Sequence, residues 1–251
     1  MKSSIYFTLP FALCGLAFGV NGASATEFVT NGGFESSMYS VSQELFGPNT
    51  PATNWASNGN FVLYCTAAVG TTCDSSILNG GALAGPANGN NNGLTSSPQG
   101  GAYMAFDSDP SFHGDFTQTI AGLAVGDSYT LSFYMAGAQE INNSGPTTTS
   151  ITATLGNESF TTPVIDTPAQ GFSPWKLYMT TFTYTGGGDI LNLVATGGPG
   201  GAPPYALLDG VSLMGTTGGT PEPSTWVMIM AGFAGLGLAA RARRRAKAIL
   251  A

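Results

Sequence analysis

Charged side chains are scarce in this chain of 251 residues, and basic ones are almost absent from its central part. Only 8% of the residues are charged, whereas about a quarter is usual for globular domains. Thirteen of the fourteen acidic residues lie between Glu27 and Asp209, where Lys176 is the one basic residue. A body this acidic repels phosphate backbones, so we expect no nucleic-acid partner.

Catalytic signatures are scarce as well. His113 is the only histidine, and the chain has no Gly-x-Ser-x-Gly motif, so nothing indicates a serine hydrolase. Asp107, Asp109 and Asp115 lie within nine residues of one another, and glycoside hydrolysis needs a pair of positioned carboxyls. We expect a protein that is not an enzyme. A secreted polysaccharide hydrolase that uses this aspartate cluster is the alternative.

The N-terminus has the features of a secretory signal peptide. Lys2 provides a positive charge, residues 5–20 are mostly apolar, and Ala23 and Ala25 flank Ser24 in the small-x-small pattern that signal peptidase cleaves. This pattern predicts a signal peptide over residues 1–25 and a mature protein that begins at Thr26. A retained N-terminal membrane helix is the alternative.

Cysteine is rare, and export determines how it is interpreted. Cys14 lies inside the signal peptide, which leaves Cys65 and Cys73 as the two cysteines of the mature chain. In an oxidising compartment such a pair forms a disulfide. Two cysteines and the distant His113 do not complete a tetrahedral zinc site.

The central part alternates apolar and polar residues, as strands do, and has no convincing amphipathic helix. Its 36 glycines and 15 prolines, counted over the whole chain, indicate many turns. Strands are expected over 102–106, 116–120, 128–135, 151–155, 177–184, 190–195 and 206–213. Residues 79–101 are rich in Gly, Asn and Ser and are expected to form a long surface loop. The pattern predicts an all-β, antiparallel β-sandwich over residues 26–215, here called the body.

Three segments of the body resemble the galactose-binding-like jelly-roll sandwiches to which many carbohydrate-binding modules belong. Residues 31–35 (NGGFE) are similar to their first strand, residues 116–133 to a pair of their strands, and residues 207–213 (LLDGVSL) to their closing strand. The resemblance implies a jelly roll and permits polysaccharide binding, although one fold hosts many functions.

The same resemblance implies a structural calcium ion where the first and last strands meet, with Glu35 and Asp209 at the matching positions. Hard carboxylate oxygens suit Ca²⁺, and extracellular calcium fills weak sites. A solvated acidic loop or a second calcium site are the alternatives for Asp107, Asp109 and Asp115. Trp55 and Trp175 are candidates for stacking on sugar rings, and the alternative for both is a place in the core.

A polar motif, an apolar run and an arginine cluster follow one another at the C-terminus. The motif contains Pro221, Glu222, Pro223 and Trp226, and the cluster contains Arg241, Arg243, Arg244 and Arg245. This tail, residues 221–251 after a linker at 216–220, resembles the PEP-CTERM sorting signal, with Val227 where the PEPxxWA-type variant has Ala. The resemblance implies an exported protein of a Gram-negative bacterium, processed by an exosortase-like membrane protease and often linked with extracellular polysaccharide.

The physical properties of the tail favour a transient anchor. Residues 226–240 number fifteen, which as a helix extend about 22 Å, short of a hydrocarbon core of about 30 Å. Gly232 and Gly235 weaken the helix and allow close approach of another one, and the arginines orient the tail as a cytoplasmic stop. We expect a single short hydrophobic helix that crosses the membrane transiently, with a permanent tail anchor as the alternative.

Together these features predict an exported, non-catalytic protein of the cell surface or extracellular matrix. Its partners would be signal peptidase, the exosortase-like protease and an extracellular polysaccharide, and structural Ca²⁺ is its one expected cofactor.

Overall fold

The computed structural model describes residues 25–57, 61–67, 72–75, 78, 81–216, 229–235 and 241. The predictions made for Ala23, Pro221, Glu222, Pro223, Trp226, Arg243, Arg244 and Arg245 lie outside the described residues. Residues 229–235 and Arg241 are helical, which places Gly232 and Gly235 on a short helix near the C-terminus. In the part of the chain that the structure describes, no helix is long and apolar enough to cross a membrane.

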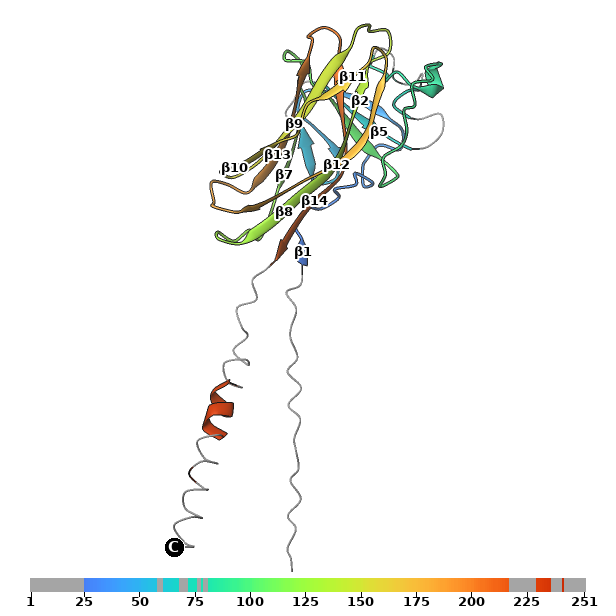
Figure 1. The fold of residues 1–251 in the computed structure, drawn as a ribbon. Helices are drawn as coiled ribbons and strands as arrows, with labels where there is room; N and C mark the ends of the chain where they lie inside the picture. Colours follow the sequence, from blue (N-terminus) through green and yellow to red (C-terminus); the bar gives the residue numbers. More distant parts are fainter. Residues whose placement is uncertain are drawn as a thin grey trace, which may run out of the picture.

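Two antiparallel sheets face each other and form the body (Figure 1). The first sheet contains, in spatial order, β12 (Phe172–Thr183), β8 (Ser128–Gln139), β14 (Pro204–Thr216), β6 (Tyr103–Asp107), β5 (Phe61–Cys65) and β2 (Gln43–Phe46), with β1 (Ala25–Glu27) paired to β14. The second contains β10 (Glu158–Thr161), β9 (Thr147–Leu155), β13 (Ile190–Gly198), β7 (Asp115–Thr119), β4 (Trp55–Ser57) and β3 (Asn49–Ala52), with β11 (Ile165–Thr167) paired to β9. The predicted all-β jelly-roll sandwich is therefore confirmed.

Apolar side chains of both sheets meet in the space between them. On β8 the buried residues Tyr129, Leu131 and Phe133 alternate with partly exposed ones, as a strand with one face in the core requires. Phe116 of the second sheet packs edge to face on Phe106 of the first, with ring centroids 5.1 Å apart. Such contacts fix the two sheets against each other.

A second apolar cluster lies on the outer face of the first sheet. The segment between β5 and β6 covers this face, where Leu78, Ala82 and Leu83 are buried. Its backbone is tied to β8, since the nitrogen of Ala84 donates to the oxygen of Gln139 at 2.9 Å. The expectation of a surface loop at 79–101 was therefore wrong for its start. The apolar residues hidden among glycines and asparagines give this segment a buried face.

All seven predicted strands are present, six of them predicted from alternation and the one at 102–106 from a short apolar run, but residues 31–35 do not form a strand. Asn31 and Phe34 have φ angles of 54° and 59°, which turn the backbone out of the extended region. Gly32 lies so close to β14 that a Cβ atom there would lie 1.8 Å from the oxygen of Val211. The resemblance of NGGFE to a first strand thus marks a tight turn against the last strand.

The body begins and ends at the same place. Ala25 pairs with Thr216 and Glu27 pairs with Met214, so β1 lies beside the end of β14 (Figure 1). Oε1 of Glu27 accepts hydrogen bonds from the backbone nitrogens of Val29 and Leu213, each at 2.8 Å. The strand that precedes the tail is therefore held by β1 and the residues after it.

Candidate functional site

Glu35 and Asp209 are brought together by two irregular segments. The register between β14 and β8 shifts between Asp209 and Ser212, and Gly210 has a φ angle of 61°. This bulge opens β14 where the turn at 31–35 packs, and the nitrogen of Val211 donates to the oxygen of Gly32 at 3.0 Å. Bulges of this kind redirect side chains. A Cβ atom on Gly33 would lie 3.9 Å from both Oδ1 of Asp209 and Cγ of Glu35.

Asp209 has a buried carboxyl, and one of its two oxygens lacks a hydrogen-bond partner among the described residues. Its side chain is 0% exposed, and Oδ1 accepts a hydrogen bond from the nitrogen of Gly210 at 2.7 Å. Among the described residues Oδ2 has no hydrogen-bond partner. Burial raises the pKa of Asp209 to about 7, and the negative charge of Glu35 adds to the rise, while hydrogen bonds from Ser97 and Gly210 oppose it. The surroundings of this carboxyl favour the addition of a proton or another positive charge.

The segment that precedes β6 also packs against Glu35 of this carboxyl pair. Oε1 of Glu35 accepts a hydrogen bond from the nitrogen of Ala102 at 2.9 Å. Gly101 has a φ angle of 74°, and a Cβ atom there would lie 1.7 Å from the same oxygen. Only glycine fits this approach. Two carboxyls surrounded by turn backbone offer the hard oxygen ligands that calcium prefers.

Side chains alone do not supply enough ligands for a metal ion here. Across the described ranges, no group of three or more His, Cys, Asp or Glu residues is placed to hold a metal ion. A calcium ion at Glu35 and Asp209 would therefore need backbone carbonyls or water for its other ligands, which Ca²⁺ accepts.

The structure keeps Asp107 and Asp109 together, since Oδ1 of Asp107 accepts a hydrogen bond from the nitrogen of Asp109 at 2.8 Å, and it places Asp115 on the other sheet. Asp107 follows Phe106, which faces the core, so its side chain points to the outer face of the first sheet. Asp115 precedes the buried Phe116 and points to the outer face of the second sheet. Asp109 is buried in a loop, where its Oδ1 accepts a hydrogen bond from the nitrogen of Ser111 at 2.7 Å. These carboxyls do not converge on one catalytic cleft.

Asp107 instead belongs to an acidic group that the sequence did not reveal. Burial raises its pKa to about 7, and the charges of Asp109 and Glu140 add to the rise. The pKa of Tyr205 is raised well above its usual value, first by burial and then by the charges of Asp107, Glu140 and Glu44. These residues come from β2, β6, β14 and the residue after β8, so only the strand register brings them together.

The two tryptophans of the body have structural roles. Trp55 is fully buried, tilts against Phe34 with ring centroids 5.4 Å apart, and donates from Nε1 to the oxygen of Asn31 at 3.0 Å. Trp175 packs edge to face on Tyr103 and donates to the oxygen of Thr95 at 3.1 Å. Trp55 therefore has no face free for a sugar ring, and Trp175 fastens β12 to the covering segment.

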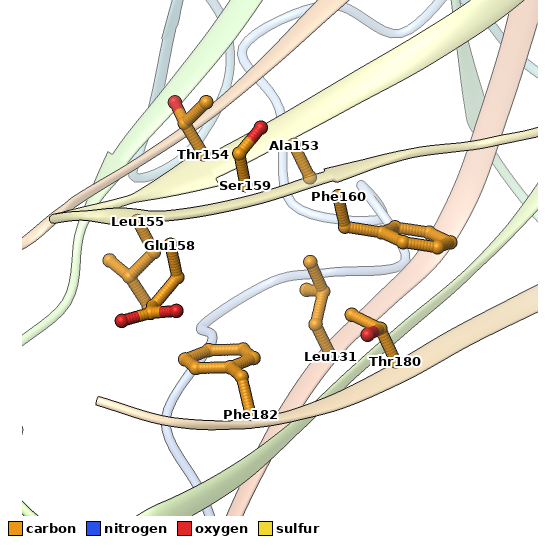
Figure 2. Close-up of a pocket in the computed structure, with 9 residues that line it drawn as sticks. All are labelled: Leu131, Ala153, Thr154, Leu155, Glu158, Ser159, Phe160, Thr180 and Phe182. Atoms are coloured by element: carbon orange, nitrogen blue, oxygen red, sulfur yellow. The ribbon is translucent and has the colours of Figure 1, made fainter. Parts of the chain in front are cut away.

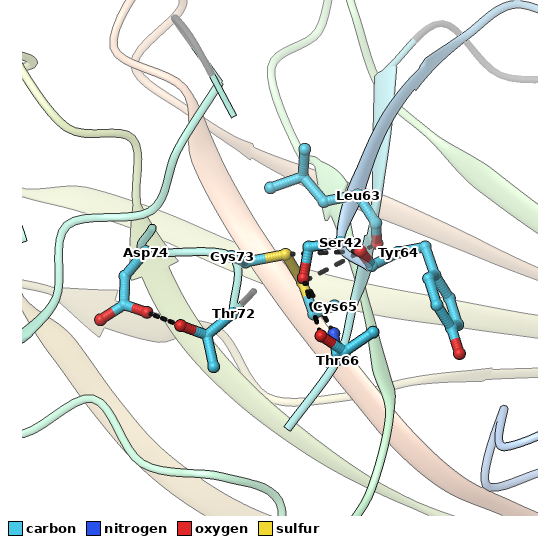
Figure 3. The surroundings of a disulfide bond; sticks show 8 residues. All are labelled: Ser42, Leu63, Tyr64, Cys65, Thr66, Thr72, Cys73 and Asp74. Atoms are coloured by element: carbon cyan, nitrogen blue, oxygen red, sulfur yellow. Dashed lines mark hydrogen bonds between the residues drawn. A yellow bond between two sulfur atoms is a disulfide. The ribbon is translucent and has the colours of Figure 1, made fainter. Parts of the chain in front are cut away.

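Cys65 and Cys73 are bonded to each other, with a Cα–Cα distance of 5.1 Å (Figure 3). Cys65 ends β5 and Cys73 lies in the covering segment, where both side chains are buried. Next to them Thr72 donates to Oδ1 of Asp74 at 2.5 Å, and Oδ2 of Asp74 accepts from the nitrogen of Ala87 at 2.9 Å. The disulfide thus anchors the start of the covering segment to the first sheet.

One cavity opens between the free edges of the two sheets (Figure 2). Leu131, Phe160 and Phe182 line it, and the carboxylate of Glu158 lies near the ring of Phe182. Its volume is about 40 Å³, whereas pockets for small molecules measure about 300 Å³ or more. It is too small for a sugar ring.

Comparison with protein families gives a result for the tail. Residues 220–245 match the model of the PEP-CTERM protein-sorting motif. The chain carries a PEP-CTERM sorting signal. The motif implies an exported protein that reaches the surface or the exterior through exosortase-type sorting, as the pattern from Pro221 to Arg245 predicted.

Solved structures similar to the body have low sequence identity. A family 61 carbohydrate-binding module, TmCBM61, in complex with β-1,4-galactotriose has 17% identity and a TM-score of 0.40, over 75% of this chain and 97% of that one. The CBM22-1 xylan-binding domain of Xyn10C from Paenibacillus barcinonensis has 10% identity and a TM-score of 0.40, over 78% and 97%. The K2 cleaved adhesin domain of Lys-gingipain has 13% identity and a TM-score of 0.36, over 78% and 100%. No curated protein matched the chain in sequence.

Proposed function

We propose that this chain is an exported, non-catalytic protein of the cell surface or extracellular matrix, sorted through its PEP-CTERM tail by an exosortase-like membrane protease. The sorting motif at residues 220–245 carries the proposal. Its place directly after the last strand supports it, since β14 ends at Thr216 and the motif begins four residues later. The body is then a cargo delivered by the tail, in a Gram-negative envelope.

We further propose that the tail is a transient membrane segment. The fifteen residues 226–240 fall short of a comfortable span, and residues 229–235 are helical with Gly232 and Gly235 among them. A short helix with small residues suits docking against another membrane helix. Arg241 and the arginines after it keep the end on the cytoplasmic side.

The body is proposed to bind polysaccharide without cleaving it. The divergent directions of Asp107 and Asp115 and the hydrogen-bonded burial of Asp109 argue against a hydrolytic pair. A structural calcium ion at Glu35 and Asp209 is proposed to hold the last strand to the turn at 31–35. The unpartnered Oδ2 of Asp209 supports it.

The test is binding and product release measured together. Mature protein purified from its host is incubated with a panel of neutral, cationic and anionic polysaccharides. Retention on at least one polymer without new reducing ends is the expected result. Release of reducing ends that disappears in Asp107→Asn would establish the hydrolase instead, and absence of retention on every polymer would refute polysaccharide binding.

A further inference from the structure

A row of side chains crosses the outer face of the first sheet at the end away from the tail. Phe46 pairs with Phe61, Val62 pairs with Phe106, and Tyr205 pairs with Asp107. Paired residues point to the same face of an antiparallel sheet, so Phe46, Phe61, Asp107 and Tyr205 form one transverse row. Glu44 stands beside Phe46 on the same face, two residues earlier on β2. We call these five residues with Glu140 the acidic row.

The rings of the acidic row run from the surface to the interior. Phe46 is 67% exposed, and its centroid lies 4.7 Å from that of Phe61. Phe61 is largely buried, and its centroid lies 5.8 Å from that of Tyr205, which is completely buried. The exposed ring of Phe46 can therefore be contacted by a ligand from solvent. The row therefore offers an open aromatic face backed by two fixed rings.

The polar groups of the row are all acidic or uncharged. The charges of Asp107, Glu140 and Glu44 act on the Tyr205 hydroxyl, which therefore lies among the three carboxyls. That hydroxyl is buried and has no hydrogen-bond partner within the described residues. Glu44 and Glu140 are only partly buried and can be reached from solvent. Burial also raises the pKa of both carboxyls. A hydrogen bond from Gly81 opposes the rise at Glu44, and at Glu140 a hydrogen bond from Asn143 opposes it while the charge of Glu44 adds to it.

This chemistry selects a positively charged ligand. Carboxylates in a partly desolvated place repel anions and gain most from a cation, and an aromatic face attracts ammonium groups. An organic cation fits this surface better than a metal ion does, because an ammonium group gains from the aromatic face as well as from the carboxylates. An exposed ring also stacks on the apolar face of a pyranose, so an amine carried by a sugar satisfies both features.

We propose that the acidic row binds the protonated amino groups of an amino-sugar polysaccharide, with a sugar ring on Phe46 and the amine between Glu44 and Glu140. The inference rests on the proposed function and specifies its ligand. Uronic-acid and sulfated polymers are excluded by the same charges. The row lies at the start of β14, about 40 Å along that strand from its end near the tail, so it faces away from the point of attachment.

A pair of oligosaccharides with the same sugar backbone, one with free amines and one with its amines acetylated and therefore uncharged, tests the proposal. Mature protein from the host is titrated with a glucosamine hexamer and with its fully N-acetylated form by calorimetry near pH 7 and low salt. We expect the glucosamine hexamer to bind at least tenfold more tightly than the acetylated one. Glu44→Gln, Glu140→Gln and Phe46→Ala should each weaken binding by about three- to tenfold.

Asp189→Asn is the matched control, since this exposed acid precedes β13 at the other end of the sandwich. It removes one charge from the body without touching the row and should leave affinity unchanged. If Asp189→Asn and Glu44→Gln weakened binding of the glucosamine hexamer equally, net charge alone would explain the effect, and the proposed site would be overturned. Tight binding of a neutral polymer that ignores the row variants would overturn this inference and leave the proposed function standing. Failure to bind any polysaccharide would overturn both.

Discussion

At the scale of residues, Asp107 and Asp209 are the unusual groups of this body. Both are buried, and burial raises the pKa of each to about 7. Their surroundings differ in one respect. Asp209 faces Glu35 across turn backbone and has an oxygen without a partner among the described residues, whereas Asp107 lies beside a tyrosine hydroxyl in the acidic row. The same rise in pKa therefore leads to different expectations for Asp107 and for Asp209.

The free energy of unfolding of the metal-free protein should fall as pH rises. An aspartate has a pKa of about 3.9 when unfolded, so the folded state holds the proton more tightly between about pH 4 and 7. The contribution of Asp107 and Asp209 is therefore fully present below pH 4 and lost by the time pH passes 7. Thermal unfolding midpoints between pH 4 and 8 in a chelator should show this decline, and Asp209→Asn should make it shallower.

Calcium should offset the loss of folding stability that comes from Asp209 at high pH, and not the loss that comes from Asp107. At pH 8, millimolar Ca²⁺ should raise the unfolding midpoint of the wild type by several degrees, because a ligand that binds only the folded state stabilises it. Asp107→Asn, which changes the other buried aspartate, should keep this response, and Asp209→Asn should lose it. An unchanged midpoint in the wild type, or an equal rise in Asp209→Asn, would contradict the calcium proposal.

Tyr205→Phe should stabilise the body. A buried hydroxyl without a partner costs about 1–3 kcal/mol in lost hydration, and the phenylalanine ring would keep the contact with Phe61. Urea unfolding should show a free energy of unfolding higher by about 1 kcal/mol. A decrease would mean that the hydroxyl makes a stabilising contact in solution.

These residues differ in how far sequence could predict them. Glu35 and Asp209 stand in short motifs with a family resemblance, so they were predicted and the structure brings them together. Glu44, Glu140 and Tyr205 lie in three distant segments with no local pattern. Only the pairing of β2 with β5 and of β14 with β6 and β8 joins them, and register is not readable from one chain.

At the scale of elements, alternation revealed the long strands and missed the short ones. The seven predicted strands all exist, and one of them, β6, was predicted from its apolar run because it is buried at every residue. The fully buried β5 has no alternation to detect, and β1, β3, β4 and β11 have only three or four residues each. The buried start of the 79–101 segment was also missed, because its few apolar residues lie among glycines.

Removal of the disulfide should loosen this covering segment. Cys65 and Cys73 are eight residues apart, and a loop of that length stabilises the folded state by about 2.5 kcal/mol through chain entropy. The double variant Cys65→Ala with Cys73→Ala should lose about that much in urea unfolding. Hydrogen exchange should rise at Leu83 and Ala84 and stay unchanged at β9. Unchanged exchange in the covering segment would show that its apolar contacts suffice.

At the scale of the whole molecule, the connection to the tail and the acidic row lie at opposite ends of the sandwich. β1 pairs with the end of β14, so the proposed sites of signal-peptide removal and tail processing lie next to the same end of the sandwich. The acidic row lies where β14 begins. This polarity suits a protein that is held or released at one end and presents the other outward.

The most direct test of the central claim is intact-mass spectrometry of the protein isolated from its native host. The sorting account predicts a chain that begins at Thr26, carries the Cys65–Cys73 disulfide, and ends at or near the Pro221–Pro223 motif, without Arg241 and the residues after it. A mature chain that still extends through Ala251 would contradict sorting by cleavage and establish a permanent tail anchor.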